Sequence, residues 1–495
     1  MIAHLKSKIK FIGNSILVIV FGLMLVSCAS QEKEKPSVPY NVLFVAFDDL
    51  NDWEGSFEGH PQAKTPNIDK LAEKGMVFSN AHCAGTMCNP SRVSVITGLR
   101  PTTTGVYTNN DTPFSAYKEN QTLNKHFKEN GYYVAGAGKI LHKFHFEKEE
   151  WDAYIGKHSK GDNWISNREH PEMEKTTKVS GNIAWGGYES SDSLTFDARS
   201  VAWVNERINR KHDKPFFLAC GIFRPHIPWF NPQKYFDMHP KEAIKLPLVK
   251  EGDLDDVPLQ GKNIAYSITN FTDANDLYND RENEEHELIK REGLWKDAVQ
   301  AYQASVSYAD AQFGNLIKTL EESPYADNTI VIVWSDHGWQ LGEKEHWRKA
   351  TLWNEVTRVP LIISMPGKDA GGRTNQPVSL IDLYPTLVEL CGLPKVEGLE
   401  GESLVPLLTN PKAKRSNPAI SSLGPEYHSV KDENYSYINY GNGQEELYDH
   451  KIDPQEWINI ANDLNYAIVK ERLKTFIPKD AQQPTKGIYN KQNQK

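Results

Sequence analysis

The sequence predicts an α/β fold: a large, mostly parallel mixed β-sheet sandwiched by helices, followed by a smaller C-terminal α+β subdomain. Short, nearly continuous apolar runs alternate with helical patterns through most of the chain. This alternation is typical of strands buried on both faces of a sheet and connected by helices. Polar clusters directly follow several of the apolar runs, and ligands bind at that carboxyl edge in open α/β sheets.

Composition sets the limits of size and partner class. The chain has 495 residues, of which 39% are hydrophobic, so it can bury one large core and a smaller one. Its formal net charge is −9 and it has no long basic run, so we expect no nucleic-acid partner. An anionic ligand would therefore need positive charge concentrated locally in its site. The five cysteines fit neither a dense disulfide framework nor a zinc ribbon.

The first 39 residues read as a targeting segment. Lysines precede an apolar run at 16–26, which has the length of a signal h-region and is short for a membrane span. Leu25-Val26-Ser27-Cys28 resembles the lipobox of bacterial lipoproteins, which implies a signal peptide over 1–27 and a lipid on Cys28. The alternative is an ordinary secretion signal with an incidental cysteine. We expect an exported protein that is lipid-anchored in a bacterial cell envelope through a flexible tether at 28–39.

Five apolar runs are the expected strands of the sheet, at 41–47, 76–78, 132–135, 216–222 and 329–334. Helices are predicted between them. Thr65 and Pro66 begin one that Gly75 ends, residues 122–130 form another, and 296–321 form a long amphipathic one.

The domain boundaries follow from composition. We expect a catalytic domain over 40–410, with polar insertions at 142–195 and 240–295 around the site and a docking helix at 381–387. An antiparallel-sheet subdomain follows over 411–485, and 486–495 is a polar tail. Within the subdomain the expected elements are strands at 435–440 and 446–448 and a helix inside 454–474.

Polar clusters at the strand ends are the candidate site: Asp48-Asp49, Lys139, Arg224 to His226, and Asp336-His337. Three carboxylates this close repel one another unless a cation lies among them, so the pattern predicts a divalent metal. Oxygen ligands favour calcium or magnesium, and His337 leaves a transition metal open. Taken singly, the Asp48-Asp49 pair also fits a turn or helix cap, and 336–338 a plain loop.

The segment from Cys88 to Gly98 predicts a helix with a cysteine at its start. Pro90 suits a first turn, and Gly98 is a natural stop. Unpaired N–H groups at a helix N-terminus favour negative charge, and Arg92 adds a cation that can fork onto an oxyanion. The alternative is a helix that merely happens to follow a cysteine.

Together these motifs resemble the type I sulfatases of the alkaline phosphatase superfamily. Cys88-Asn89-Pro90-Ser91-Arg92, with Thr97-Gly98 behind it, is similar to the signature whose cysteine is oxidised to formylglycine. The resemblance extends from Asn41 to Asp449 and is strongest to the iduronate-2-sulfatase-like branch. The motifs that carry it are Val93-Ser94, Gly138 to His142, Arg224 to Pro228, and Ser335 to Trp339.

This resemblance implies a set of roles. Asp48, Asp49, Asp336 and His337 would bind Ca²⁺ (or Mg²⁺) together with the formylglycine that a maturase makes from Cys88. The hydrated aldehyde would attack sulfur, displace the alcohol and then release sulfate. Arg92, Lys139 and Lys349 would neutralise the sulfate oxygens, His226 would protonate the leaving oxygen, and His142 would assist. By analogy, Tyr107, Asn110 and Trp339 would line the sugar pocket.

The expected activity is hydrolysis of a sulfuric ester in a sulfated carbohydrate. The best single expectation is a 2-O-sulfated uronic acid in an extracellular polysaccharide or its oligosaccharides. The alternatives are a phosphonate or phosphate ester hydrolase of the same superfamily, and a glycan-binding lipoprotein without catalysis. Two residues depart from the family pattern: Leu99 stands where arginine is usual after Thr-Gly, which bears on cysteine conversion, and Asn89 is unusual at its position.

Overall fold

The computed structural model describes residues 39–112, 121–142, 148–156, 177–180, 183–189, 191–266, 284–367 and 371–485. The expected signal peptide, Cys28, nearly all of the tether, the polar tail and parts of both insertions lie outside these residues. Within the described ranges, no helix has both the length and the apolarity needed to span a membrane.

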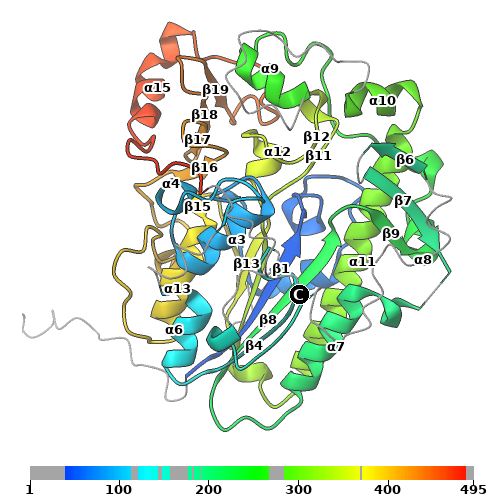
Figure 1. Ribbon diagram of the computed structural model, residues 1–495, viewed down its shortest axis with the longest axis vertical. Coiled ribbons are helices and arrows are strands. Elements are labelled where there is room, and N and C mark those ends of the chain that lie inside the picture. The colour runs from blue at the N-terminus through cyan, green and yellow to red at the C-terminus, as the bar shows by residue number, and fades with distance from the viewer. Residues whose placement is uncertain are drawn as a thin grey trace, which may run out of the picture. The chain divides into compact units, whose positions relative to one another are not determined.

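A mixed eight-stranded sheet forms the centre of the fold (Figure 1). Its order is β14 (Gly372–Thr374), β2 (Met76–Phe78), β13 (Leu361–Ser364), β10 (Thr329–Ser335), β1 (Asn41–Asp48), β8 (Phe216–Pro225), β4 (Tyr133–Gly138) and β5 (Ala153–Ile155). The strands from β10 to β5 are mutually parallel, whereas β13 runs antiparallel to both β10 and β2. The expected mostly parallel mixed sheet is therefore confirmed.

Strand β1 shows why the sheet is covered on both faces. Every residue of the strand is buried. Leu43, Val45 and Phe47 belong to one apolar cluster, and the alternate residues Val42, Phe44 and Ala46 belong to another. Successive side chains of a strand point to opposite faces, so a continuous apolar run needs a core on each side.

Helices supply those two cores (Figure 1). One face is covered by α2 (Pro66–Lys74), α7 (Phe196–Ile208) and the long α11 (Trp295–Glu321). The other face is covered by α3 (Cys88–Thr97), α6 (Leu123–Glu129) and α13 (Leu383–Leu390). The expected docking helix is thus α13, which packs on α3.

Shorter elements complete the sheet domain. They are β3 (Ala81–His82), α4 (Pro101–Thr104), β6 (Thr177–Ser180), β7 (Ile183–Tyr188), β9 (Trp229–Pro232), α8 (Gln233–Asp237), α9 (Leu259–Tyr266), α10 (Glu285–Arg291), β11 (Gln340–Leu341), β12 (Trp347–Arg348), α12 (Asn354–Thr357), β15 (Val378–Ser379) and α14 (Val405–Thr409). Helices α9 and α10 lie in the second of the two polar insertions. Neither helix was predicted, because both are short and only weakly patterned.

The C-terminal part contains a four-stranded antiparallel sheet with a helix packed on it. The strand order is β16 (Ala419–Ser422), β17 (His428–Lys431), β18 (Tyr435–Asn439) and β19 (Glu445–Asp449). Helix α15 (Ala467–Lys474) buries Leu473 in the small apolar core of this sheet. The α+β subdomain is confirmed. Strands β16 and β17 were not predicted because their sequences are short and largely polar.

Candidate active site

Four neighbouring parallel strands end at one edge and gather the polar clusters there. Strand β1 ends at Asp48, β4 ends just before Lys139, β8 ends just before His226, and β10 ends just before Asp336. These strands are adjacent in the order β10, β1, β8, β4. Clusters nearly 290 residues apart in sequence therefore become neighbours in space. They lie at the carboxyl edge of the sheet, where ligands bind in open α/β sheets.

Helix α3 brings Cys88 and Arg92 to this edge. The helix begins at Cys88 and ends at Gly98, whose φ of 69° suits a glycine cap and whose N–H donates to the Ser94 carbonyl at 2.8 Å. Arg92 is fully buried: its Nε donates to Asp336 Oδ2 at 2.8 Å and its Nη2 to Asp48 Oδ1 at 3.3 Å. Arg92 therefore ties the ends of β1 and β10 together, in addition to placing a cation near position 88.

Cationic groups surround the buried Cys88 sulfur. Lys349 Nζ lies 3.0 Å from Sγ, Lys139 Nζ lies 3.5 Å away, and His337 Nε2 lies 3.4 Å away. Burial alone would disfavour a thiolate, but the two lysines hold the pKa of Cys88 well below its usual value, and hydrogen bonds from His142 and His226 act in the same direction. The site is built to stabilise negative charge on the side chain at position 88.

Carboxylates surround the same lysines that approach Cys88. Lys349 Nζ contacts Asp49 Oδ1 at 2.6 Å, and Lys139 Nζ contacts Asp48 Oδ2. Burial opposes ionisation of Asp48, but Lys139 and the other nearby cations keep its pKa below the usual range. Asp49 Oδ2 is buried and has no hydrogen-bond partner among the described residues.

This donor set fits a divalent cation. Single ligand atoms of Asp48, Asp49, Cys88 and His337 all lie within 4.8 Å of one another. His337 Nδ1 lies 2.9 Å from the Gly338 carbonyl oxygen. A carbonyl only accepts, so Nδ1 carries a proton, and the neutral form of the ring would present the Nε2 lone pair to a cation in the cluster. The orphaned Asp49 oxygen and this lone pair are what a metal site requires.

Asp336 borders the cluster. Its Oδ1 accepts from the backbone N–H groups of Asp49 and His337, at 3.1 and 3.0 Å, and it lies 3.6 Å from His337 Nε2. Burial raises the pKa of Asp336 to about 7. Burial disfavours the His337 cation, but the adjacent Asp336 carboxylate raises the pKa of His337 to about 9. A bound cation would favour the ionised carboxylate and the neutral imidazole.

Two features of this edge carried no signal in the sequence. Asp49 has a φ of 66°, in the left-handed region that side chains rarely adopt, and such strain is concentrated at functional sites. Tyr302 on α11 holds this turn: its hydroxyl donates to the Asp49 carbonyl at 2.9 Å and accepts from Asn51 N–H at 2.9 Å. Residues about 250 apart make this contact, so only the fold reveals it.

Two lysines and a histidine with partly exposed side chains line the opening of the site. The side chains of Lys139, Lys349 and His226 are 12%, 14% and 21% exposed, whereas the Asp48, Asp49 and Asp336 side chains are inaccessible. His226 Nε2 lies 3.9 Å from Asp49 Oδ2. Burial lowers the pKa of His142, which hydrogen bonds to Cys88, to about 4. An anion entering here would meet positive charge first.

The three residues expected to line a sugar pocket are placed differently from one another. Trp339 is 0% exposed and packs against Trp229, and Tyr107 is 1% exposed with its hydroxyl donating to the Gln482 carbonyl at 2.8 Å. Both side chains are therefore packed inside the protein in this structure, with Lys349 Nζ 5.6 Å from the centre of the Trp339 ring. Asn110 is exposed at a loop tip.

Comparisons with known proteins agree with this geometry. The Sulfatase family model matches residues 40–393, and a model for the C-terminal part of N-sulphoglucosamine sulphohydrolase matches 342–483. A protein named "Sulfatase" from Formosa agariphila is 36% identical over 481 residues, covering 93% of this chain and 91% of the relative.

A second relative and a solved structure extend the comparison. The mouse (Mus musculus) iduronate 2-sulfatase is 31% identical, over 77% of this chain and 73% of its own. The crystal structure of a phosphonate monoester hydrolase of Agrobacterium radiobacter superposes with a TM-score of 0.71 at 22% identity, covering 88% of this chain and 94% of the other. That last likeness shows the fold. The family model and the two sequence relatives together show that this chain belongs to the sulfatase family.

Proposed function

We propose that the chain hydrolyses the sulfate ester of a 2-O-sulfated uronic acid in an extracellular polysaccharide or its oligosaccharides. The nucleophile is a formylglycine that a maturase makes from Cys88. The observation that carries the proposal is the set of cationic and imidazole groups within 3.5 Å of the Cys88 sulfur. Membership in the sulfatase family supports the reaction, and the iduronate 2-sulfatase relative supports the sugar.

The residues around position 88 can divide the work of ester cleavage. Lys139 and Lys349 face an anion that enters the opening and neutralise oxygens on which charge develops. Arg92 holds the ends of β1 and β10 in register with the nucleophile and adds to the positive potential. His142 accepts or returns the proton of the nucleophilic oxygen.

His226 is the proposed general acid. Its Nδ1 lies 2.6 Å from the Ile227 carbonyl oxygen, so Nδ1 carries a proton. When the ring is cationic, Nε2 also carries a proton, and this nitrogen faces the opening beside Asp49. Protonation of the leaving oxygen from Nε2 would matter most for a sugar alkoxide, which is a poor leaving group.

The metal proposed for the cluster is Ca²⁺. Asp48, Asp49 and His337, together with the side chain at position 88, would hold it, with Asp336 as a further ligand or as a support for His337. Bound there, a divalent cation supplies Lewis-acid polarisation and lowers the pKa of a hydroxyl. We also propose export and lipid anchoring at Cys28, for which the N-terminal sequence pattern is the support.

The first experiment is the mass of the peptide that contains Cys88, in protein co-expressed with a maturase. Conversion of thiol to aldehyde removes roughly 18 Da. The converted protein is then assayed on 2-O-sulfated uronic acid oligosaccharides, on a 6-O-sulfated glucosamine oligosaccharide and on a phosphonate monoester, with Ca²⁺ or Mg²⁺ added after chelation.

Sulfate release confined to the uronic acid substrate supports the proposal. Faster turnover of the phosphonate would favour the phosphonate hydrolase alternative, for which the solved neighbour gives the fold precedent. An unconverted thiol in protein that binds sulfated glycan and releases no sulfate would favour a binding lipoprotein. Reactivation by Mg²⁺ with none by Ca²⁺ would overturn the metal assignment.

A further inference from the structure

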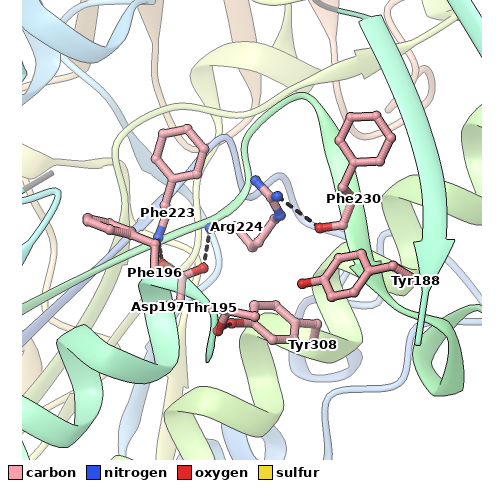
Figure 2. Close-up of a pocket in the computed structure, with 8 residues that line it drawn as sticks. All are labelled: Tyr188, Thr195, Phe196, Asp197, Phe223, Arg224, Phe230 and Tyr308. Atoms are coloured by element: carbon pink, nitrogen blue, oxygen red, sulfur yellow. Dashed lines mark hydrogen bonds between the residues drawn. The ribbon is translucent and has the colours of Figure 1, made fainter. Parts of the chain in front are cut away.

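The loop that carries His226 is built around a buried arginine. Arg224 is 3% exposed, and its guanidinium contacts the segment 223–231, which runs from the end of β8 through His226 into β9 and is called the loop below. Nη1 donates to the His226 carbonyl at 3.0 Å, Nη2 to the Phe230 carbonyl at 2.9 Å, and Nε to Asn231 Oδ1 at 3.1 Å. Figure 2 shows the guanidinium pointing at the Phe230 carbonyl, above Tyr188 and Tyr308. One side chain therefore fastens both limbs of the loop.

Two helices anchor this arginine-centred loop to the core. Asp197 on α7 accepts from the Phe223 and Arg224 N–H groups, at 2.6 and 3.1 Å (Figure 2). Asn231 Nδ2 donates to Ser305 Oγ on α11 at 2.7 Å. Helix α7 thus holds the start of the loop and helix α11 holds its end. Arg224 joins these two ends of the loop.

The charge of Arg224 is expensive to bury and needs a reason. A buried guanidinium loses hydration, and the charge of the nearby Asp197 carboxylate only partly offsets that loss. All three of the donor contacts described above end on the loop itself, and none reaches the Cys88 cluster. The fork geometry of arginine is suited to holding several oxygen atoms at fixed positions, which a lysine cannot reproduce.

We propose that Arg224 is a positioning residue that fixes His226 Nε2 at the opening of the site. The inference rests on the proposed role of His226 as the general acid. The direct link is the contact between Arg224 Nη1 and the His226 carbonyl. Loss of the guanidinium lets the 226–231 segment shift, and a displacement of about 1 Å at a proton donor can cost 10²-fold in rate.

Kinetics with two leaving groups test this role. Arg224→Met is expected to lower kcat about 10²-fold on a saccharide sulfate, with KM nearly unchanged, and less than about threefold on 4-nitrophenyl sulfate, which needs no protonation. Arg224→Lys should recover part of the loss. Arg207→Met is the matched control, because Arg207 is a buried arginine on α7 that packs on Trp203 and makes no described contact with the loop.

A double-variant cycle separates positioning from general damage. If Arg224 acts through His226, Arg224→Met combined with His226→Ala should be no slower than His226→Ala alone. Multiplicative losses in the double variant, or equal losses on both substrates, would overturn the proposal. If Arg224→Met does not fold, Arg224→Lys takes its place in this cycle.

Amide hydrogen exchange gives a readout that does not depend on turnover. The N–H groups of 226, 227 and 229–231 should exchange faster in the Arg224 variants than in the wild type. Their exchange rates in Arg207→Met and His226→Ala should equal those of the wild type. Unaltered exchange in the Arg224 variants overturns the positioning role. If the wild type releases no sulfate while exchange behaves as expected, the proposed function fails and the arginine-centred loop stands.

Discussion

Lys139 and Lys349 approach the Cys88 sulfur from different segments, and their positions explain why an anion is favoured at this one side chain. Lys139 follows β4 and Lys349 follows β12, so neither is a sequence neighbour of the cysteine. Each lysine also contacts one of the paired aspartates. Both ammonium groups are therefore held by fixed carboxylates while their remaining donors face position 88.

Replacing Cys88 with alanine should abolish turnover and leave the fold intact. The lysine–aspartate pairs survive the change, so we expect a loss of at least about 10³-fold in kcat and only a small shift in Tm. Steady-state kinetics and a thermal melt measure both. Cys391→Ala, at a buried cysteine in the apolar cluster of the α3 face, is the control that should keep its activity. Turnover that persists in Cys88→Ala rules out this nucleophile.

Glu54 should make the protein less stable at alkaline pH. Burial raises its pKa from 4.5 to about 8. Between these values the folded state keeps a proton that the unfolded state has released, so the free energy of unfolding falls as pH rises from 4.5 to 8 and is flat above. Glu54→Gln should therefore gain roughly 2 to 4 kcal/mol at pH 9 and little at pH 5.

Denaturant unfolding at both pH values measures the Glu54 effect. The exposed Glu58→Gln variant is the control and should follow the wild type. A gain of equal size at pH 5 and pH 9 would show that proton linkage at Glu54 is not the cause.

At the scale of elements, strands β1, β8 and β10 were predictable because both of their faces are apolar over six or more residues. The polar residues at their ends predicted the site, because neighbouring parallel strands end at the same carboxyl edge of the sheet. Tyr302, on α11, could not be predicted, because only the fold creates its contact with the Asp49 carbonyl. Arg224 belongs to a predicted polar cluster, but its contact with the His226 carbonyl carried no signal in the sequence. Burial of Trp339 and Tyr107 was equally invisible, since aromatic residues suit cores and sugar pockets alike.

Asn89 connects helix α3 to the loop at 105–112. Its contacts there explain why asparagine occupies a position at which the family pattern makes it unusual. Its side-chain amide donates to the Thr108 and Asp111 carbonyls at 3.0 Å each, and its N–H donates to Asn109 Oδ1 at 2.9 Å. The other side of this loop is bonded to the C-terminal segment, where the Thr485 N–H donates to the Gly105 carbonyl at 2.9 Å. The loop beside the nucleophile is thus held from two directions.

Asn89→Ala should loosen this loop without removing a reacting group. The carbonyls of the half-buried Thr108 and the buried Asp111 lose their donor, so we expect a loss of about 1 to 3 kcal/mol in stability. We also expect KM to rise severalfold on an oligosaccharide and to change little on 4-nitrophenyl sulfate. Asn465→Ala, an exposed asparagine far along the chain, is the control. An unchanged oligosaccharide KM would show that the loop does not contact the sugar.

At the scale of the whole described chain, a buried ionic network joins the C-terminal sheet to the sheet domain. Glu456 is inaccessible, and its Oε1 accepts from Lys431 Nζ and His450 Nε2, both at 2.9 Å. Its Oε2 accepts from the Asn354 N–H at 2.9 Å, and its carbonyl accepts from Lys344. Composition indicated a separate subdomain, but it carried no sign of this network, because the partners are spread over more than 100 residues.

Glu456→Gln tests whether the two sheets unfold as one unit. Burial opposes ionisation, but Lys431 and His450 hold the pKa of Glu456 well below its usual value, so the carboxylate is charged and paired in the folded state. The amide leaves the Lys431 ammonium buried without its counter-charge, which costs about 3 to 5 kcal/mol. Calorimetry should show one cooperative transition at a lower Tm, whereas the exposed Glu471→Gln control should melt like the wild type. A contradicting result would be a small unfolding transition at lower temperature, separate from a main transition whose Tm is unchanged. The C-terminal sheet would then unfold independently, and the network would stabilise only that subdomain.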